Sequence, residues 1–220
     1  MKLRFLSGNK HKIAEVQKIL GPTGVEIIAV SEKIEELQTE NVERLVRDKL
    51  SKAFGIIGRP LFVEHTGLYL VGMNGLPAGL TQIFWDKLQA DKFVDLVRGL
   101  GNQKVVAKTV LGYCDGRQVH LFEGTVNGVV PNAPAGNRDF QWDCVFVPDG
   151  HTETFAEMGD RKNDISMRRK ALDEFKAFLA PREAAYEGRA SACIRVGQAR
   201  PLRRCGSFRK PGSSVVESAD

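Results

Sequence analysis

Residues 62–77 read FVEHTGLYLVGMNGLP, and the rest of the chain can be interpreted outward from this stretch. Its apolar residues predict a short strand over residues 60–63, a turn at Thr66 and Gly67, and a second apolar run over residues 68–71. Glu64 and His65 then fall at the end of the first strand. A carboxylate and an imidazole held there cost free energy unless a charged ligand binds, and a magnesium-bound triphosphate meets that requirement.

The composition is that of an ordinary globular protein. The chain has 220 residues, 42% hydrophobic and 27% charged, enough for one sizeable core or for two lobes that share a cleft. No apolar run approaches the roughly 20 residues of a membrane helix, and the start, MKLRFLSGNKHK, turns polar too early for a signal peptide. We therefore expect a cytoplasmic protein with no membrane partner. The four cysteines lack CxxC spacing, which favours reduced structural thiols over a zinc site.

The net charge of +5 is concentrated at the C-terminal end of the sequence. Residues 181–220 contain eight Lys and Arg against four Asp and Glu, whereas residues 1–180 contain 24 against 23. The pattern predicts a nearly neutral folded domain over residues 1–180, which argues against nucleic-acid binding, and a basic, disordered tail over residues 181–220. Binding of an acidic partner by the tail is the alternative interpretation.

A strand, a glycine turn and a helix are predicted at the N-terminus. Residues 3–6 are apolar, SGNKHK follows at residues 7–12, and apolar residues then recur at helical spacing to Leu20. Free backbone N–H groups at such a helix start, with lysines beside them, can hold phosphate oxygens. The turn lacks the GxxxxGK[ST] spacing of a Walker loop, so an ordinary junction is the alternative.

The same patterns predict the remaining elements. They are a strand over residues 25–30, helices over residues 40–57, 80–88 and 92–100, a hairpin of strands 105–114 and 119–130, a strand over residues 144–147, and a final helix to about residue 180. Lys49 interrupts the apolar face of the 40–57 helix, which a buried stem with a solvated ammonium group would explain. The aromatic segment 136–143 either covers the core or, with the basic start of the final helix, binds a base and its phosphates.

Five motifs, taken in order, resemble the inosine triphosphate pyrophosphatase family, which removes non-standard purine nucleoside triphosphates. They are SGNKHK at residues 7–12, VEHTGL at 63–68 with a downstream GLP, FQWD to VFVPDG at 140–150, FAEM at 155–158, and KNDISMR at 162–168. The resemblance spans residues 3–180 and omits the tail. It implies an elongated mixed α/β fold, with a β-sheet flanked by helices and two lobes around a central nucleotide-binding cleft, and it also implies a homodimer.

Carried over residue by residue, the resemblance implies a complete site. The family's phosphate-binding loop matches Ser7, Asn9 and Lys12. Its metal-binding glutamate matches Glu36, with Glu35 and Glu40 as alternatives because of a local gap. Its helix lysine and acidic pair match Lys49, Glu64 and His65, which we assign as catalytic. The base-binding loop and the final signature match Phe140, Trp142, Asp143, Lys162, Ser166, Met167 and Arg168.

These residue types suit the release of pyrophosphate from a nucleoside triphosphate. Water attacks the α-phosphorus, and the charge of the departing pyrophosphate must be neutralised. Glu36 and Glu64 are the carboxylates that a Mg²⁺ cofactor prefers, and Phe140 is placed to stack on the purine. Four cations are available to neutralise phosphate charge in the transition state: Lys12, Lys49, Lys162 and Arg168.

Two positions depart from the family pattern. His65 stands where the family has an aspartate; an imidazole of ordinary pKa about 6.5 can accept a proton from water, but Mg²⁺ prefers oxygen ligands. Complete loss of general-base help would cost on the order of 10²- to 10⁴-fold in rate. Met167 stands where the family has a histidine that reads the 6-oxo edge of the purine. A thioether cannot donate that hydrogen bond, and an unpaired buried carbonyl costs roughly 1–3 kcal/mol.

Three functions are therefore compatible with the sequence. The first is a nucleoside triphosphate pyrophosphatase acting on a non-standard purine nucleotide, in sanitation of the nucleotide pool. The second is a nucleotide-binding module of the same fold without turnover, and the third is an enzyme for another phosphorylated substrate such as a modified pyrimidine nucleotide. The apolar segment 80–88 is either part of a dimer interface or ordinary core.

Overall fold

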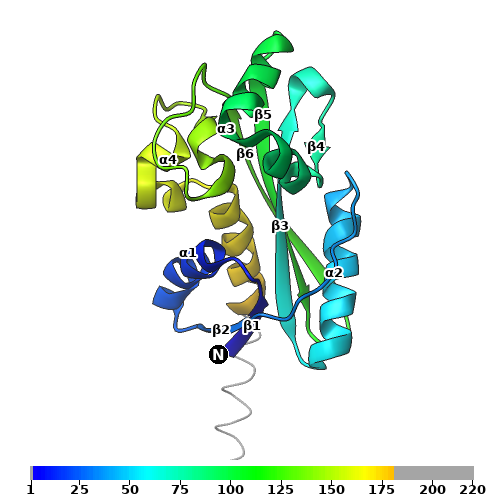
Figure 1. The fold of residues 1–220 in the computed structure, drawn as a ribbon. Helices are drawn as coiled ribbons and strands as arrows, with labels where there is room; N and C mark the ends of the chain where they lie inside the picture. The colour runs from blue at the N-terminus through cyan, green and yellow to red at the C-terminus, as the bar shows by residue number, and fades with distance from the viewer. Residues whose placement is uncertain (1, 181–220) are drawn as a thin grey trace, which may run out of the picture. The chain divides into compact units, whose positions relative to one another are not determined.

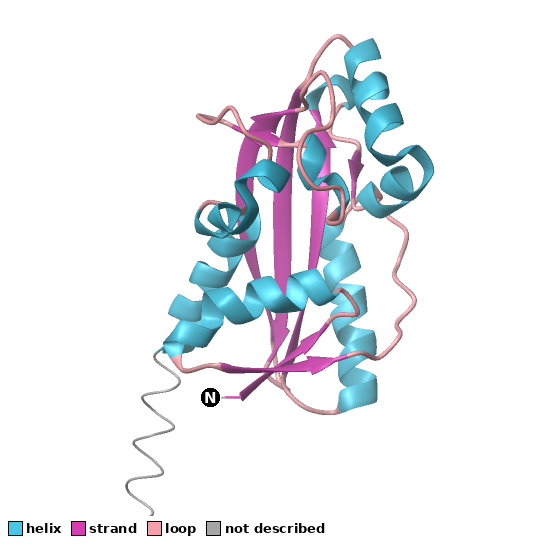
Figure 2. Ribbon diagram, turned by 60° about the vertical axis from the view of Figure 1, so that its left-hand side comes forward, coloured by secondary structure: helices cyan, strands magenta, loops and turns pink. Residues whose placement is uncertain are grey.

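A computed structural model describes residues 2–180 of the chain. One mixed sheet runs through this part, and Figure 2 shows its long strands side by side. Its strands lie in the order β2 (Glu26–Val30), β1 (Lys2–Leu6), β3 (Leu61–Leu70), β5 (Lys104–Cys114), β6 (Val119–Val129) and β7 (Val147–Pro148), with the short β4 (Pro77–Ala78) also paired to β3. β1 is parallel to both β2 and β3, and the other pairs are antiparallel.

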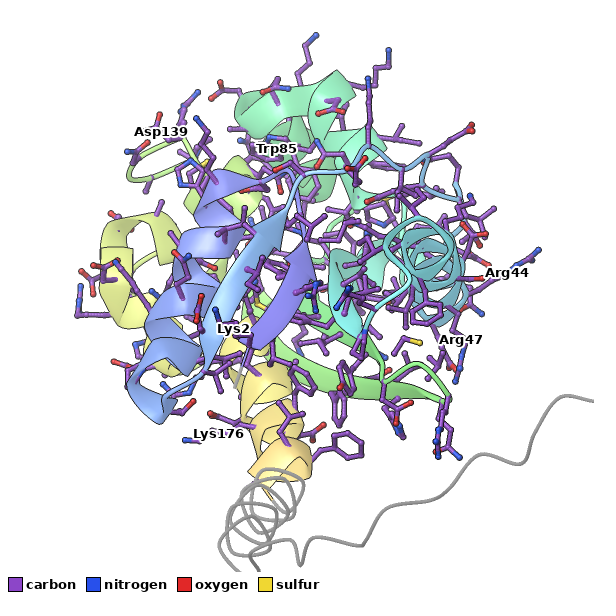
Figure 3. The ribbon with its side chains drawn as sticks, turned by 90° about the horizontal axis from the view of Figure 1, so that it is seen from below. Lys2, Arg44, Arg47, Trp85, Asp139 and Lys176 are labelled. Atoms are coloured by element: carbon purple, nitrogen blue, oxygen red, sulfur yellow. The ribbon has the colours of Figure 1, made fainter. Side chains whose placement is uncertain are left out.

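Helices cover both faces of this sheet, which confirms the predicted α/β class. They are α1 (Lys10–Leu20), α2 (Val42–Ile57), α3 (Thr81–Gly99), the short α4 (Phe155–Met158) and a final helix over residues 167–180. In Figure 1, α2 lies on one side of β3 and the final helix on the other. Figure 3 shows Arg44 and Arg47 of α2 pointing away from the sheet. The predicted disordered tail over residues 181–220 lies outside the described residues.

The predicted turn at Thr66 and Gly67 is wrong, because β3 is one continuous strand. All ten of its residues pair with β5. Gly67 serves a close approach instead: a Cβ at this position would lie 2.4 Å from the carbonyl oxygen of Ala78. Glycine is therefore required here for β4 to lie against β3, and no change of chain direction is needed.

Side chains of β3 alternate between two separate apolar clusters. Leu61 and Val63 pack with the apolar face of α2, whereas Phe62 packs with the final helix. Because successive strand residues point to opposite faces, Glu64 belongs to the face of the final helix and His65 to the face of α2. The continuous strand therefore directs these two side chains to opposite faces of the sheet.

The structure confirms one further prediction and contradicts another. The two helices predicted over residues 80–88 and 92–100 are the two parts of α3, which meet at a kink at Gln89, whose φ of 53° and ψ of −175° are not helical. The strand predicted over residues 144–147 is wrong, because a 3₁₀ helix covers Gln141–Val145 and β7 contains only Val147 and Pro148. Apolar runs of this length do not distinguish strand from helix, and here Cys144, Val145 and Phe146 are all buried in the main apolar cluster.

Three remaining predictions concern membranes, thiols and the dimer segment. Within residues 2–180, no helix is long and apolar enough to cross a membrane. Cys114 and Cys144 are buried and form no disulfide, while the other two cysteines lie outside the described residues. In the segment 80–88, Trp85 is buried in the core and Ile83 is 41% exposed, so the segment contributes to the core and also presents an apolar side chain at the surface.

Two glycine substitutions should have opposite effects on stability. In β6, a Cβ at Gly124 would lie 1.9 Å from the carbonyl oxygen of Met167, so Gly124→Ala must displace the final helix. We expect it to lower the free energy of unfolding by about 2–4 kcal/mol. Gly55 in α2 is exposed, and a Cβ there would meet no atom within 4 Å. Gly55→Ala should therefore raise stability by about 0.5–1 kcal/mol. Equal urea midpoints for the two variants would contradict this assignment.

Candidate active site

An interruption in strand pairing creates the candidate site. β1 pairs with β3 only at Leu61 and Phe62, and β4 reaches the same edge of β3 only at Leu68 and Tyr69. Within the described part of the chain, residues 63–67 therefore have no strand on that edge. Glu64 and His65 lie in this gap, where side chains from both faces of β3 border a single cavity.

The cavity has a volume of about 520 Å³ and collects most of the predicted phosphate and metal residues. It lies among β3, the start of α1, α2 and the segment before α2, and the 3₁₀ helix Gln141–Val145. The predicted residues that line it are Ser7, Asn9, Lys12, Glu36, Lys49, Glu64, His65 and Trp142. Neither Glu35 nor Glu40 lines it, so Glu36 is the one glutamate of these three that borders the cavity.

Local hydrogen bonds hold the loop between β1 and α1. The side chain of Asn9 accepts a hydrogen bond from the backbone N–H of Lys12 at 3.2 Å and caps α1. The hydroxyl of Ser7 accepts from the backbone N–H of Asn9 at 3.2 Å, and the Ser7 N–H donates to the Val30 carbonyl at 3.1 Å. These bonds place the N-terminus of an eleven-residue helix beside the cavity, where it favours anions.

Glu64 is the centre of a buried ion cluster on the face of the final helix. Arg168 donates to both of its carboxylate oxygens, at 2.7 and 3.1 Å, and Nζ of Lys12 lies 2.9 Å from Oε1. Burial by itself would raise the pKa of Glu64, but Arg168 and Lys12 outweigh it and hold the pKa well below 4.5. Glu64 is therefore a carboxylate at neutral pH, and Lys12 links it to the phosphate loop.

Glu36 and Lys49 form a second ion pair on the face of α2, next to His65. Nδ1 of His65 lies 3.8 Å from Oε2 of Glu36, which is too long for a hydrogen bond. The Nε2 atom of His65 is buried and also without a partner among the described residues. Burial, together with the positive charge of Lys12, lowers the pKa of His65 to about 4, so the imidazole is neutral at pH 7.

A second cavity of about 330 Å³ contains residues predicted to bind the base. Phe140, Asp143 and Lys162 line it, and Nζ of Lys162 lies 4.1 Å from the centroid of the Phe140 ring. Lys162 also forms ion pairs with Asp143 and, at 2.6 Å, with Glu15. Burial nevertheless raises the pKa of Asp143 to about 6. The arrangement offers an aromatic face with both a carboxylate and an ammonium group beside it.

The remaining three predicted residues line neither cavity. The hydroxyl of Ser166 accepts from the backbone N–H of Arg169 at 3.1 Å and so caps the final helix. Met167 is 2% exposed and packs in the main apolar cluster. Arg168 is 3% exposed and joins Glu64 to Glu15. Their predicted contacts with a nucleotide stay predictions.

Sequence reasoning did not identify Glu15, which lines the second cavity and is joined through Arg168 to Glu64 at the first. It lies in α1, is 8% exposed, and pairs with both Lys162 and Arg168. A signal for it was present in the sequence, because Glu15 directly precedes Val16 on the side of α1 that carries apolar residues. A buried carboxylate at such a position requires cationic partners from elsewhere in the fold.

The donors at the first cavity fit a divalent cation held together with a phosphate ligand. Glu36 and Glu64 are the oxygen donors that Mg²⁺ prefers, and both border the same space. Within residues 2–180, no group of three or more His, Cys, Asp and Glu forms a metal cage. A cation bound here would therefore complete its coordination with phosphate oxygens and water, as Mg²⁺ commonly does.

Acid should destabilise the fold through Glu64. Because the folded-state pKa of this group lies below its ordinary value of 4.5, its contribution is complete above pH 4.5 and is lost as the pH falls further. Between about pH 4.5 and 2.5, urea unfolding of a Glu64→Gln variant should lose less stability than the wild type. Glu43→Gln, at an exposed position in α2, should keep the wild-type slope. Identical slopes for all three proteins would contradict the assignment.

Comparison with known proteins gives a consistent result. The model of the Ham1 family matches residues 3–178. Over 184 residues the chain is 38% identical to "Inosine triphosphate pyrophosphatase" of Yarrowia lipolytica, covering 82% of this chain and 96% of the relative. Over 178 residues it is 34% identical to "dITP/XTP pyrophosphatase" of Methanopyrus kandleri, covering 80% and 94%.

Solved structures support the same fold. A HAM1 protein from Coxiella burnetii superposes with a TM-score of 0.72 at 21% identity, covering 82% of this chain and 99% of that one. The Ham1 protein of Staphylococcus aureus gives 0.70 at 22% identity, covering 83% and 100%. At these identities the structures establish the fold, while the sequence matches establish the relationship. The chain therefore belongs to the Ham1 family.

Proposed function

We propose that this chain hydrolyses a non-standard purine nucleoside triphosphate to the monophosphate and pyrophosphate, and so removes such nucleotides from the cellular pool. The observation that carries the proposal is the convergence of a phosphate loop and two carboxylates, Glu36 and Glu64, on one cavity. The names of the relatives support the reaction. The cytoplasmic location and the homodimer predicted from the sequence are part of the same proposal.

The triphosphate would occupy the first cavity. The N-terminus of α1 and the ammonium group of Lys12 face anionic oxygens there, and Lys49 approaches from α2. Glu36 and Glu64 would hold a divalent cation, predicted to be Mg²⁺, which supplies charge neutralisation for the leaving pyrophosphate. In the structure Lys12 pairs with Glu64, and Lys49 pairs with Glu36. When a cation binds to the two carboxylates, both lysines can turn toward the phosphate groups.

His65 is the group best suited to orient or deprotonate the attacking water. It borders the cavity, it is neutral at pH 7, and Nδ1 faces the Glu36 carboxylate. A neutral imidazole can accept one proton, and Glu36 stabilises the cation that results. The family resemblance implies this role for the aspartate that His65 replaces.

The base would lie in the second cavity, against Phe140. Stacking on that ring leaves Lys162 and Asp143 beside the edge of the base. Lys162 can donate to an oxo group and the carboxylate of Asp143 can accept from a ring N–H. An oxo group next to a protonated ring nitrogen is the edge of hypoxanthine and xanthine, which favours purine substrates of that type.

The test is pyrophosphate release with Mg²⁺ from inosine, xanthosine, guanosine, adenosine, deoxyuridine and thymidine triphosphates. We expect the inosine and xanthosine nucleotides to be cleaved faster than the adenosine and pyrimidine nucleotides, because adenine lacks the oxo group and pyrimidines stack less well on Phe140. Guanine has the same oxo group beside a ring N–H, so Lys162 and Asp143 do not separate it from hypoxanthine. Absence of cleavage with every nucleotide would contradict the proposed reaction. If the wild type releases no pyrophosphate and the His65→Asp variant does, the chain is a nucleotide-binding module. Faster cleavage of the pyrimidine nucleotides would point to a different substrate class.

A further inference from the structure

The strongest unexplained feature of the molecule is the imidazole of His65. The residue is 7% exposed, its Nε2 atom is buried without a hydrogen-bond partner among the described residues, and its Nδ1 atom lies 3.8 Å from Oε2 of Glu36. A buried polar group without a partner costs roughly 1–3 kcal/mol. His65 also borders the cavity that contains both proposed metal-binding carboxylates. Nδ1 is the nitrogen that a ligand in the cavity can reach, because Nε2 is fully buried.

The position of the ring relative to Glu36 suits a shared ion. Nδ1 of His65 and Oε2 of Glu36 are 3.8 Å apart. Two donors that are each about 2.1 Å from one ion lie roughly 3 to 4 Å from each other. A carboxylate oxygen and an imidazole nitrogen at this separation can therefore bind one cation from the face of α2. The second carboxylate, Glu64, reaches the cavity from the opposite face of β3.

We propose that His65 is a nitrogen ligand to the divalent cation and makes the site prefer Mn²⁺ to Mg²⁺. Mg²⁺ favours sites made wholly of oxygen, whereas first-row transition ions accept imidazole together with carboxylates. Mn²⁺ also shares the affinity of Mg²⁺ for phosphate oxygens. The inference rests on the proposed function only in placing a cation and a polyphosphate in this cavity, and it assigns the Nδ1 lone pair of His65 to the cation instead of to a proton of the attacking water.

Lys12 and Lys49 affect the choice of probe. Both lysines line the cavity and form ion pairs with Glu64 and Glu36. A cation that binds without phosphate is therefore repelled by two positive charges. A polyphosphate draws the lysines away and adds oxygen ligands. The experiment therefore uses the full chain with Mn²⁺ or Mg²⁺ in the presence of inorganic triphosphate, which carries no base and so makes no demand on the second cavity.

Pulsed electron paramagnetic resonance of bound Mn²⁺ gives the direct readout. We expect a nitrogen modulation in the wild type, changed to the ¹⁵N pattern when histidine is ¹⁵N-labelled, and absent from His65→Asp. The His120→Gln variant, altered at a histidine outside both cavities, should retain the modulation. A wild type that binds Mn²⁺ without nitrogen modulation, or that binds no Mn²⁺ with triphosphate, would overturn the proposal.

Titration of the two ions gives the second readout. An added carboxylate strengthens binding of every cation, so the informative quantity is the ratio of Mn²⁺ to Mg²⁺ affinity. We expect His65→Asp to lower this ratio on the order of tenfold. An unchanged ratio would contradict the inference. Neither readout requires catalysis. Nitrogen modulation without any pyrophosphate release would support the metal assignment and contradict the proposed reaction. Pyrophosphate release without nitrogen modulation would support the reaction and contradict the metal assignment.

Discussion

Replacing Lys12 by methionine is expected to reduce the rate of pyrophosphate release on the order of 10²- to 10³-fold, the usual loss when one donor to a developing charge is removed. The ammonium group lies in the cavity, 2.9 Å from Glu64 and beside the N-terminus of α1. Burial, opposed in part by Glu64, lowers the pKa of Lys12. Methionine preserves most of the buried stem and removes only the charge.

The matched control for this variant is Lys10→Met, at the exposed first residue of α1. It removes the same charge from the same helix, two residues away, and should change the rate less than about threefold. Initial rates at saturating nucleotide, with circular dichroism to confirm folding, separate the two variants. Equal rates for Lys10→Met and Lys12→Met would mean that Lys12 does not contact the reacting phosphates.

Replacing Arg168 by leucine is expected to lower the free energy of unfolding by about 3–5 kcal/mol, the cost of removing one partner from a buried ion cluster. Arg168 is 3% exposed and bridges the buried carboxylates of Glu64 and Glu15. Without the guanidinium group, each carboxylate keeps a single lysine partner, Lys12 or Lys162. Two partly compensated charges would then remain in the interior.

The neighbouring residue provides the control. Arg169 is 37% exposed at its side chain and pairs with Asp173 one turn later in the final helix. Arg169→Leu should cost no more than about 0.5 kcal/mol, because exposed pairs of this spacing contribute little. Urea unfolding at pH 7 measures both. Arg168→Lys should lie between wild type and Arg168→Leu, since lysine keeps the charge but lacks the planar fork. A similar loss for both leucine variants would contradict a buried cluster.

Much of the secondary structure follows from local pattern. Apolar spacing predicts α1 and α2, and Asp115-Gly116 between two β-rich runs predicts the hairpin of β5 and β6. These signals are local because the apolar spacing of a helix and the turn residues of a hairpin involve only residues that are close together in the sequence. The predicted turn at Thr66 and Gly67 is wrong for a related reason: glycine marks both turns and close contacts, and only the position of Ala78 in β4 distinguishes them.

The members of the candidate site were predicted from motif order, but their grouping was not. Adjacent positions in one motif do not share surroundings: Glu64 pairs with Arg168 and Lys12, whereas His65 lies beside Glu36. Likewise Met167, predicted at the base, is packed in the apolar core. A short motif specifies residue types, and the alternation of a strand or helix then directs successive side chains to different partners.

The sequence alone determined the class of the fold, the order of most of its elements and the residue types that suit a triphosphate and a cation. Only the tertiary structure decided that β1 and β4 each leave β3 partly unpaired, so that Glu64, His65 and Thr66 border one cavity from both faces of the sheet. It also decided that Arg168 joins Glu64, at the first cavity, to Glu15, at the second, in one buried ion cluster. The physical reason is that local periodicity acts over a few residues, whereas ion pairs and strand edges depend on segments that the chain brings together from more than a hundred positions apart.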